Sequence, residues 1–121
     1  MQGTVVVINS SKGSVVASSA KLATTYGERR RGLLGRTSLE EGEGLVIRPC
    51  KGVHSFGMKF PIDVAYVSKD GEILHTISPL HPNRIGPLIL RAAWVLELPQ
   101  GALCRTGTCP GDILTICACE A

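Results

Sequence analysis

The stretch IDVAYVSKDGEILHTIS, residues 62–78, contains two runs of β-branched and aromatic residues separated by Asp70 and Gly71. An Asp-Gly pair readily adopts the left-handed backbone angles of a tight hairpin turn, so this stretch predicts two antiparallel strands. A two-residue loop would place Tyr66 opposite His75, whereas a three-residue loop with a glycine bulge would shift that register. The hairpin is therefore expected, and the sequence leaves its register open.

Short segments of similar composition extend on both sides of this hairpin, bounded by Gly, Pro, Asn or Ser. Strands are predicted at residues 4–9, 14–18, 44–48, 92–98 and 112–120, and residues 20–24 are compatible with another. Residues 79–87 hold three of the seven prolines and are expected to form a loop. Residues 99–103 are expected to form a turn. The chain is thus predicted to be a series of short strands joined by turns and loops.

Residues 26–34 form the segment whose pattern favours a helix. Thr25 is followed three residues later by Glu28, the spacing of a capping box, in which each side chain binds a backbone N–H of the other residue. Gly35 lies where a left-handed helix cap is expected. About seven strands with one short helix predict a mainly β domain, a compact barrel or sandwich.

The composition is that of one soluble globular domain spanning residues 1–121. Hydrophobic residues make up 44% of the chain and charged residues 19%, which excludes a disordered chain. The net charge of +3 is mild, no glycine-rich phosphate loop is present, and aromatic residues do not interleave the basic ones, so nucleic-acid binding is not expected. No apolar run reaches the length of a membrane span, so no membrane partner is expected.

The five cysteines cannot all pair within one chain, because their number is odd. The opening stretch MQGTVVVIN lacks a basic start followed by a long apolar segment, which favours a cytoplasmic protein with free thiols. Cys104 and Cys109 have a spacing found in zinc sites, but Cys117 and Cys119 do not complete such a set, and a buried structural role is expected for the last two, or at least for whichever points inward. A monomer without metal or cofactor is therefore predicted.

The stretch CKGVHSFGMKFPID, residues 50–63, combines the composition of a core strand with residue types that form catalytic and metal sites. Side chains alternate along an extended chain, so Met58 and Lys59 would face opposite sides. An extended segment is predicted at residues 54–60, with Met58 in the core and Lys59 and Asp63 on a polar rim. A structural role is favoured for Asp63, as an acceptor of backbone N–H groups from a neighbouring loop. The alternative role for Asp63 is to pair with a cation at the mouth of a pocket.

Cys50 and His54 could act as a nucleophile and its base only within hydrogen-bond reach of each other. Four residues apart on a strand, they would be on the order of 13 Å apart, although a turn at Gly52 could bring them closer. A thiol-dependent enzyme is therefore one alternative. Metal binding is another, because Cys50, His54 and Met58 are soft ligands that suit Cu(I).

Three motifs in order give the chain a family resemblance. They are ERRRGLLGRTSLEEGEGLVI (28–47), CKGVHSFGMKFPIDVAYVSKDGEIL (50–74), and AAWVLELPQG (92–101) followed by GD (111–112). This order resembles the bacterial and archaeal family called domain of unknown function 192. Leu34 replaces a usual methionine, and the matching positions are Arg29, Gly32, Leu33, Gly35, Arg36, Cys50, His54, Met58, Lys59, Pro61, Ile62 and Asp63, with Val95, Leu96, Glu97 and Leu98 in the late strand. The resemblance implies a compact β-barrel-like or sandwich domain and no particular activity.

Seven residues from these motifs are expected to meet at loops around one pocket. They are Arg29, Arg36, Cys50, His54, Met58, Lys59 and Asp63. The predicted function is that of an uncharacterised small binding or accessory module, whose polar-rimmed pocket takes an unknown small molecule or a protein partner. The thiol-dependent enzyme and the metal-binding protein remain alternatives, and the sequence does not decide whether a reaction is catalysed.

Overall fold

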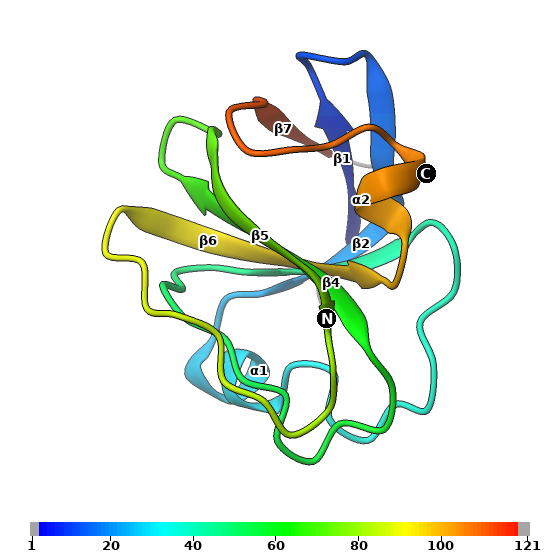
Figure 1. The fold of residues 1–121 in the computed structure, drawn as a ribbon, viewed down its shortest axis with the longest axis vertical. Coiled ribbons are helices and arrows are strands. Elements are labelled where there is room, and N and C mark those ends of the chain that lie inside the picture. The colour runs from blue at the N-terminus through cyan, green and yellow to red at the C-terminus, as the bar shows by residue number, and fades with distance from the viewer. Residues whose placement is uncertain (1–2, 119–121) are drawn as a thin grey trace.

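The computed structural model describes residues 3–118, in which seven strands form a single sheet (Figure 1). The strands are β1 Thr4–Asn9, β2 Ser14–Ala23, β3 Glu43–Ile47, β4 Ile62–Ser68, β5 Ile73–Leu80, β6 Ala92–Pro99 and β7 Leu114–Ala118. Two short helices accompany them, α1 at Tyr26–Arg31 and α2 at Ala102–Arg105. The predicted mainly β fold of about seven strands is confirmed, with one helix more than expected.

The strand order in the sheet is β5-β4-β6-β3-β2-β1-β7. Neighbours run antiparallel except β2 and β3, which are parallel and need the crossover that α1 and the chain after it provide. The two edge strands meet at one end, where the N–H of Ile73 donates to Asp112 O (2.9 Å) and that of Leu114 donates to Gly71 O (2.8 Å). Beyond that end, β5 and β7 do not pair in the described chain, so the sheet curls toward a barrel without closing.

The hairpin predicted around Asp70 and Gly71 is confirmed as β4 and β5. At the turn the register is that of the three-residue loop with a glycine bulge, because the N–H of Gly71 donates to Ser68 O (3.0 Å) and the N–H of Ser68 donates to Glu72 O (2.9 Å). Tyr66 nevertheless pairs with His75, because an irregularity between Tyr66 and Val67 shifts the register by one residue. Gly71 has a φ of 91°, a left-handed conformation that glycine adopts without a steric cost.

Several predicted boundaries are corrected by the structure. Residues 14–18 and 20–24 belong to one continuous strand, β2. Helix α1 ends three residues earlier than predicted because Gly32 leaves the helical conformation with a φ of 51°, and its N–H donates to Glu28 O. Where the sequence predicts only a turn at 99–103, the chain begins the one-turn helix α2.

The predicted extended segment at residues 54–60 is wrong. His54 makes a single β-bridge, and the chain then turns at Gly57, which has a φ of 81°. The physical reason is local hydrogen bonding, since the N–H of Met58 donates to Ser55 O (3.1 Å) and closes a turn that a strand could not contain. Alternation along this segment therefore does not determine which side chains are buried.

Both faces of the sheet are covered, and β6 shows how its side chains divide between them. Trp94, Leu96 and Leu98 pack in the apolar cluster on the α2 side, whereas Val95 packs in the cluster on the α1 side. Alternate residues of a strand share a face, so Glu97 lies on the same side as Val95. A carboxyl group thus occupies the apolar face of a central strand, beneath α1.

Candidate functional site

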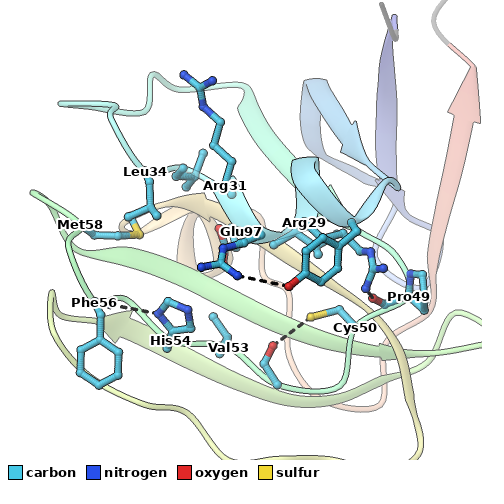
Figure 2. Close-up of a pocket in the computed structure, with 16 residues that line it drawn as sticks. Arg29, Arg31, Leu34, Pro49, Cys50, Val53, His54, Phe56, Met58 and Glu97 are labelled. Atoms are coloured by element: carbon cyan, nitrogen blue, oxygen red, sulfur yellow. Dashed lines mark hydrogen bonds between the residues drawn. The ribbon is translucent and has the colours of Figure 1, made fainter.

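A cavity of about 280 Å³ lies between α1 and the segment 49–58 (Figure 2). The sheet contributes Ile47 of β3 and Glu97 of β6 to it. Other lining residues include Arg29, Leu33, Cys50, Val53 and Met58. Mostly apolar walls with a few polar groups are typical of sites for small molecules.

Helix α1 brings three consecutive arginines to this cavity. The predicted capping box fixes the start of the helix: the N–H of Glu28 donates to Thr25 Oγ1 (3.1 Å), and the N–H of Thr25 donates to Glu28 Oε1 (3.1 Å). Arg29, Arg30 and Arg31 follow in the last turn, where the helix dipole favours positive charge. None of the three forms an ion pair within residues 3–118, so the cavity mouth carries uncompensated positive charge.

Glu97 is the most buried polar side chain of the cavity, with 4% of its surface exposed. Its neighbours across the sheet are Leu45 and Val64, which offer no polar side-chain atoms. The Glu97 carboxyl makes no side-chain hydrogen bond or ion pair within the described part of the chain. Burial raises the pKa of Glu97 to about 7, because the charged form loses its hydration. The group can therefore be present in either protonation state near neutral pH.

Arg29 carries the second unsatisfied group. Its Nε is buried and has no hydrogen-bond partner in the described chain, and its Nη1 makes one long bond of 3.4 Å to Pro49 O. Arg29 and Glu97 line the same cavity but do not form an ion pair with each other (Figure 2). The Glu97 carboxyl thus remains available to a molecule that occupies the space, and the Arg29 guanidinium, held by one long bond, belongs to the same lining.

The thiol of Cys50 and the imidazole of His54 both line the cavity, but each is bonded locally (Figure 2). Cys50 Sγ donates to Gly52 O (2.9 Å), and His54 Nδ1 accepts the N–H of Phe56 (3.3 Å). Burial raises the pKa of the Cys50 thiol, which disfavours the thiolate that a nucleophile requires. No hydrogen bond joins the thiol to the imidazole, so the described site lacks a nucleophile and base pair.

A two-stranded ribbon forms the wall of the cavity opposite α1. Residues 51–55 pair with residues 84–89 in antiparallel fashion through backbone hydrogen bonds of 2.8 to 2.9 Å. Gly86 is required at their closest approach, because a Cβ there would lie 2.5 Å from Tyr66 Oη and 2.8 Å from Val53 Cγ1. The ribbon thereby fixes the position of Val53, which faces the cavity.

Four of the seven predicted site residues come together at the cavity. Arg29, Cys50, His54 and Met58 line it. Met58 is buried, at 8% exposure, as the sequence predicts. Lys59 follows it but is exposed and lies outside the cavity lining.

The remaining two predicted residues have other partners. Arg36 Nη2 forms an ion pair of 2.9 Å with Glu43 Oε1. Asp63 is fully buried, and its Oδ2 accepts the N–H groups of Gly101 (3.1 Å) and Leu103 (3.0 Å). This is the structural role that the sequence favours for Asp63, and it places that carboxyl group away from the cavity.

Glu97 is the site residue that the sequence analysis misses. A signal for it exists, because Glu97 is the only charged residue in AAWVLELP, residues 92–99. A lone carboxyl group in an apolar strand must be paired, protonated or functional. Its place beneath α1 depends on strand pairing between β6, β3 and β4, which local sequence patterns do not specify.

Within residues 3–118, no three His, Cys, Asp or Glu side chains are grouped so that they could hold a metal ion. Free thiols are found at Cys50, Cys104, Cys109 and Cys117, of which the last is half-buried. Cys119 lies outside the described residues, so the burial expected for one or both of Cys117 and Cys119 stays a prediction. No helix in the described part of the chain is long and apolar enough to cross a membrane. The monomeric state and the cytoplasmic location stay predictions.

The model of one protein family, DUF192, described as "Uncharacterized ACR", matches residues 7–116. The chain belongs to this family. The resemblance drawn from the three sequence motifs is thereby confirmed. No functionally curated protein matches the chain.

Two solved structures resemble this DUF192 chain closely in fold. A protein of unknown function from Novosphingobium aromaticivorans is 26% identical, with a TM-score of 0.79 over 93% of this chain and 83% of its own. A "putative transcription regulator" from Sinorhizobium meliloti is 25% identical, with a TM-score of 0.78 over 96% of this chain and 94% of its own. This DUF192 chain therefore spans most of the length of both.

Proposed function

We propose that this DUF192 chain is a binding module that takes a small ligand into the Glu97 cavity. The observation that carries the proposal is the presence of two buried, unpartnered groups of opposite polarity in one cavity, the Glu97 carboxyl and Arg29 Nε. Leaving a buried polar group without a partner costs about 1–3 kcal/mol. A ligand that bonds to both groups would recover that cost.

The dimensions of the cavity support a small ligand. Its volume of about 280 Å³ is close to the lower end of the usual range for ligand pockets, roughly 300–1,000 Å³. Leu33, Val53 and Met58 supply apolar contact area, while the arginines of α1 surround the opening. The ligand is therefore expected to combine an apolar body with polar groups that reach Arg29 and Glu97.

Binding is favoured over thiol catalysis by the state of the two candidate catalytic groups. The Cys50 thiol donates to a backbone carbonyl and has a raised pKa, and His54 accepts a backbone N–H. Neither arrangement activates a nucleophile. The chain could still bind a ligand through the Glu97 carboxyl, which has no partner in the described chain, and the Arg29 guanidinium, which has one long bond.

The name of the Sinorhizobium meliloti neighbour does not lead us to propose nucleic-acid binding for this chain. Its two described helices have six and four residues, which is short for a helix that reads a DNA groove. The three arginines of α1 also surround a concave apolar space rather than a flat surface. A small ligand fits this shape better than a phosphate backbone.

The proposal is tested by titrating isotope-labelled protein with a panel of small carboxylates, amines, amino acids, amides and alcohols. We expect one class of compound to shift the amide resonances of residues 50–58 and 97. Leu34→Trp should abolish these shifts, because Leu34 lies on the cavity lining and is 36% exposed. Val15→Trp is the matched control, since Val15 is 54% exposed and lies outside this lining.

Two outcomes would overturn the proposal. One is that no class of compound shifts these resonances selectively. The other is that the Leu34→Trp protein, shown to be folded by its spectrum, responds to the active compounds as the Val15→Trp protein does. Either result would mean that the space beneath α1 is not a ligand site.

A further inference from the structure

We infer that the Glu97 cavity binds a free α-amino acid with an aliphatic or thioether side chain. This inference rests on the proposed function and specifies its ligand. Glu97 would accept hydrogen bonds from the ammonium group, Arg29 would donate to the carboxylate, and the side chain would lie against Val53 and Met58. The pair of unpartnered groups and the apolar wall are both part of the same lining.

The Glu97 carboxyl and the Arg29 guanidinium call for different partners in a ligand. The Arg29 guanidinium lines the cavity and makes only one long bond, from Nη1 to Pro49 O (3.4 Å), and a carboxylate is the acceptor that matches a guanidinium group best. Glu97 is a buried acceptor with no donor, and an ammonium group has three N–H donors and no acceptor. An α-amino acid carries both groups on one carbon atom, so a single small molecule can serve the donor and the acceptor.

The net charge of the surroundings argues against ligands that carry only one of these groups. A simple amine would have to pass the three arginines of α1, which repel a cation and have no acidic partner in the described chain. A simple carboxylate would bind the arginines and leave Glu97 without a donor unless Glu97 stays protonated. The zwitterion avoids both costs.

The side chain expected for the ligand follows from the apolar residues that line the cavity. Leu33 and Leu34 follow α1 on one side, and Val53 and Met58 lie on the other. Apolar side chains of this kind suit an unbranched or singly branched aliphatic chain, and the volume of about 280 Å³ leaves no room for a long peptide. Leucine and methionine are therefore the probes of choice.

The pH dependence of binding separates the zwitterion from its main rival, a carboxylate held by protonated Glu97. A bound ammonium group favours the charged form of Glu97, so amino-acid affinity should rise between pH 6 and 8. A carboxylate that accepts a bond from the protonated group should lose affinity over the same range. The two ligand classes therefore give opposite signs.

Other titratable side chains near Glu97 could also contribute to the pH dependence of binding. Burial raises the pKa of the Cys50 thiol and raises the pKa of Tyr66 to about 12, so neither the thiol nor the phenol ionises below pH 8. His54 lines the same cavity and is also an ionisable side chain. The pH series is therefore repeated on His54→Gln, which should keep the sign of the dependence.

The experiment compares leucine with 4-methylpentanoate, which lacks the amino group, and with 3-methylbutylamine, which lacks the carboxylate. Calorimetric titration should give leucine an affinity at least about tenfold higher than either analogue, because each analogue leaves one buried group unbonded. Glu97→Gln should weaken leucine binding by about tenfold or more while leaving 4-methylpentanoate binding unchanged or stronger. If Glu97→Gln fails to fold, Arg29→Gln replaces it, with Arg105→Gln, an exposed residue of α2 outside this lining, as the control.

Each result has a defined meaning. If 4-methylpentanoate binds as tightly as leucine, or leucine affinity falls between pH 6 and 8, the inference is wrong and the cavity remains a ligand site. The inference also fails, and the proposed function stands, if another compound class from the panel binds and neither leucine nor methionine does. If nothing binds in the cavity, both are wrong.

Discussion

Asp63 Oδ2 accepts the backbone N–H of Leu103 at 3.0 Å, across 40 residues of sequence. The same oxygen accepts the N–H of Gly101 at 3.1 Å, and Oδ1 accepts the hydroxyl of Ser78 at 2.7 Å. Gly101 is the N-cap of α2 and has no side chain to satisfy the first N–H groups of that helix. A carboxyl group from β4 therefore caps a helix that follows β6.

Asp63→Ala should destabilise the protein substantially, because the change leaves two N–H groups and one hydroxyl without their acceptor. We expect a loss of about 3 kcal/mol in the free energy of unfolding, measured by urea denaturation. The matched control is Asp70→Ala in the exposed hairpin turn, which should stay within about 0.5 kcal/mol of the parent. Equal effects of the two substitutions would contradict the capping role.

Gly86→Ala should disturb the ribbon that forms one wall of the cavity. Its new Cβ would lie 2.5 Å from Tyr66 Oη and 2.8 Å from Val53 Cγ1, so backbone or side chains must move. We expect a loss of about 1–3 kcal/mol, together with displaced amide resonances for residues 51–55. Gly27→Ala is the control, since no atom lies within 4 Å of its new methyl group and the change should stabilise α1 by up to about 1 kcal/mol. A silent Gly86→Ala would mean that the ribbon is not closely packed against β4.

Local chemistry in the sequence accounts for the elements that were predicted correctly. Asp70 and Gly71 specify the turn between β4 and β5, and Thr25 with Glu28 specifies the start of α1. In each case the interacting groups are a few residues apart, so the sequence contains the whole interaction. The start of α2 was missed because its acceptor, Asp63, is supplied from a distant strand.

The candidate site was predicted in part for the same reason. Cys50, His54 and Met58 were found because one short motif contains them, and all three reach the cavity. Glu97 belongs to β6, and its place beneath α1 is set by pairing with β3 and β4. The predicted strand at 54–60 failed because side-chain alternation cannot reveal a turn closed by backbone hydrogen bonds.

Met58 and Lys59 are adjacent residues with opposite expected roles. Met58→Ala should lower the free energy of unfolding by about 2–4 kcal/mol, since Met58 is buried in the cluster on the α1 side. Lys59→Ala should change it by less than about 0.5 kcal/mol, because its side chain is exposed. Chemical denaturation of both variants checks the assignment. A silent Met58→Ala beside a strongly destabilised Lys59→Ala would show that the two side chains have been placed the wrong way round.

Glu97 should make the stability of the folded protein depend on pH between about 4.5 and 7. Its pKa is raised from 4.5 to about 7 by burial, so the folded state binds this proton more tightly than the unfolded state does. The favourable contribution is fully present below pH 4.5, where both states are protonated. It is lost as pH rises through 7, at most about 1.4 kcal/mol per pH unit.

Glu97→Gln isolates this contribution, because the amide has nearly the same shape and no charge. Relative to the parent protein, the variant should gain about 2–3 kcal/mol in free energy of unfolding between pH 5 and pH 8. Urea denaturation of both proteins at the two pH values measures the difference, and other titrating groups cancel because both proteins contain them. A gap between parent and variant that is the same at pH 5 and pH 8 would mean that Glu97 is ionised and solvated in the folded state. In that case the buried acceptor on which the ligand site depends would not exist.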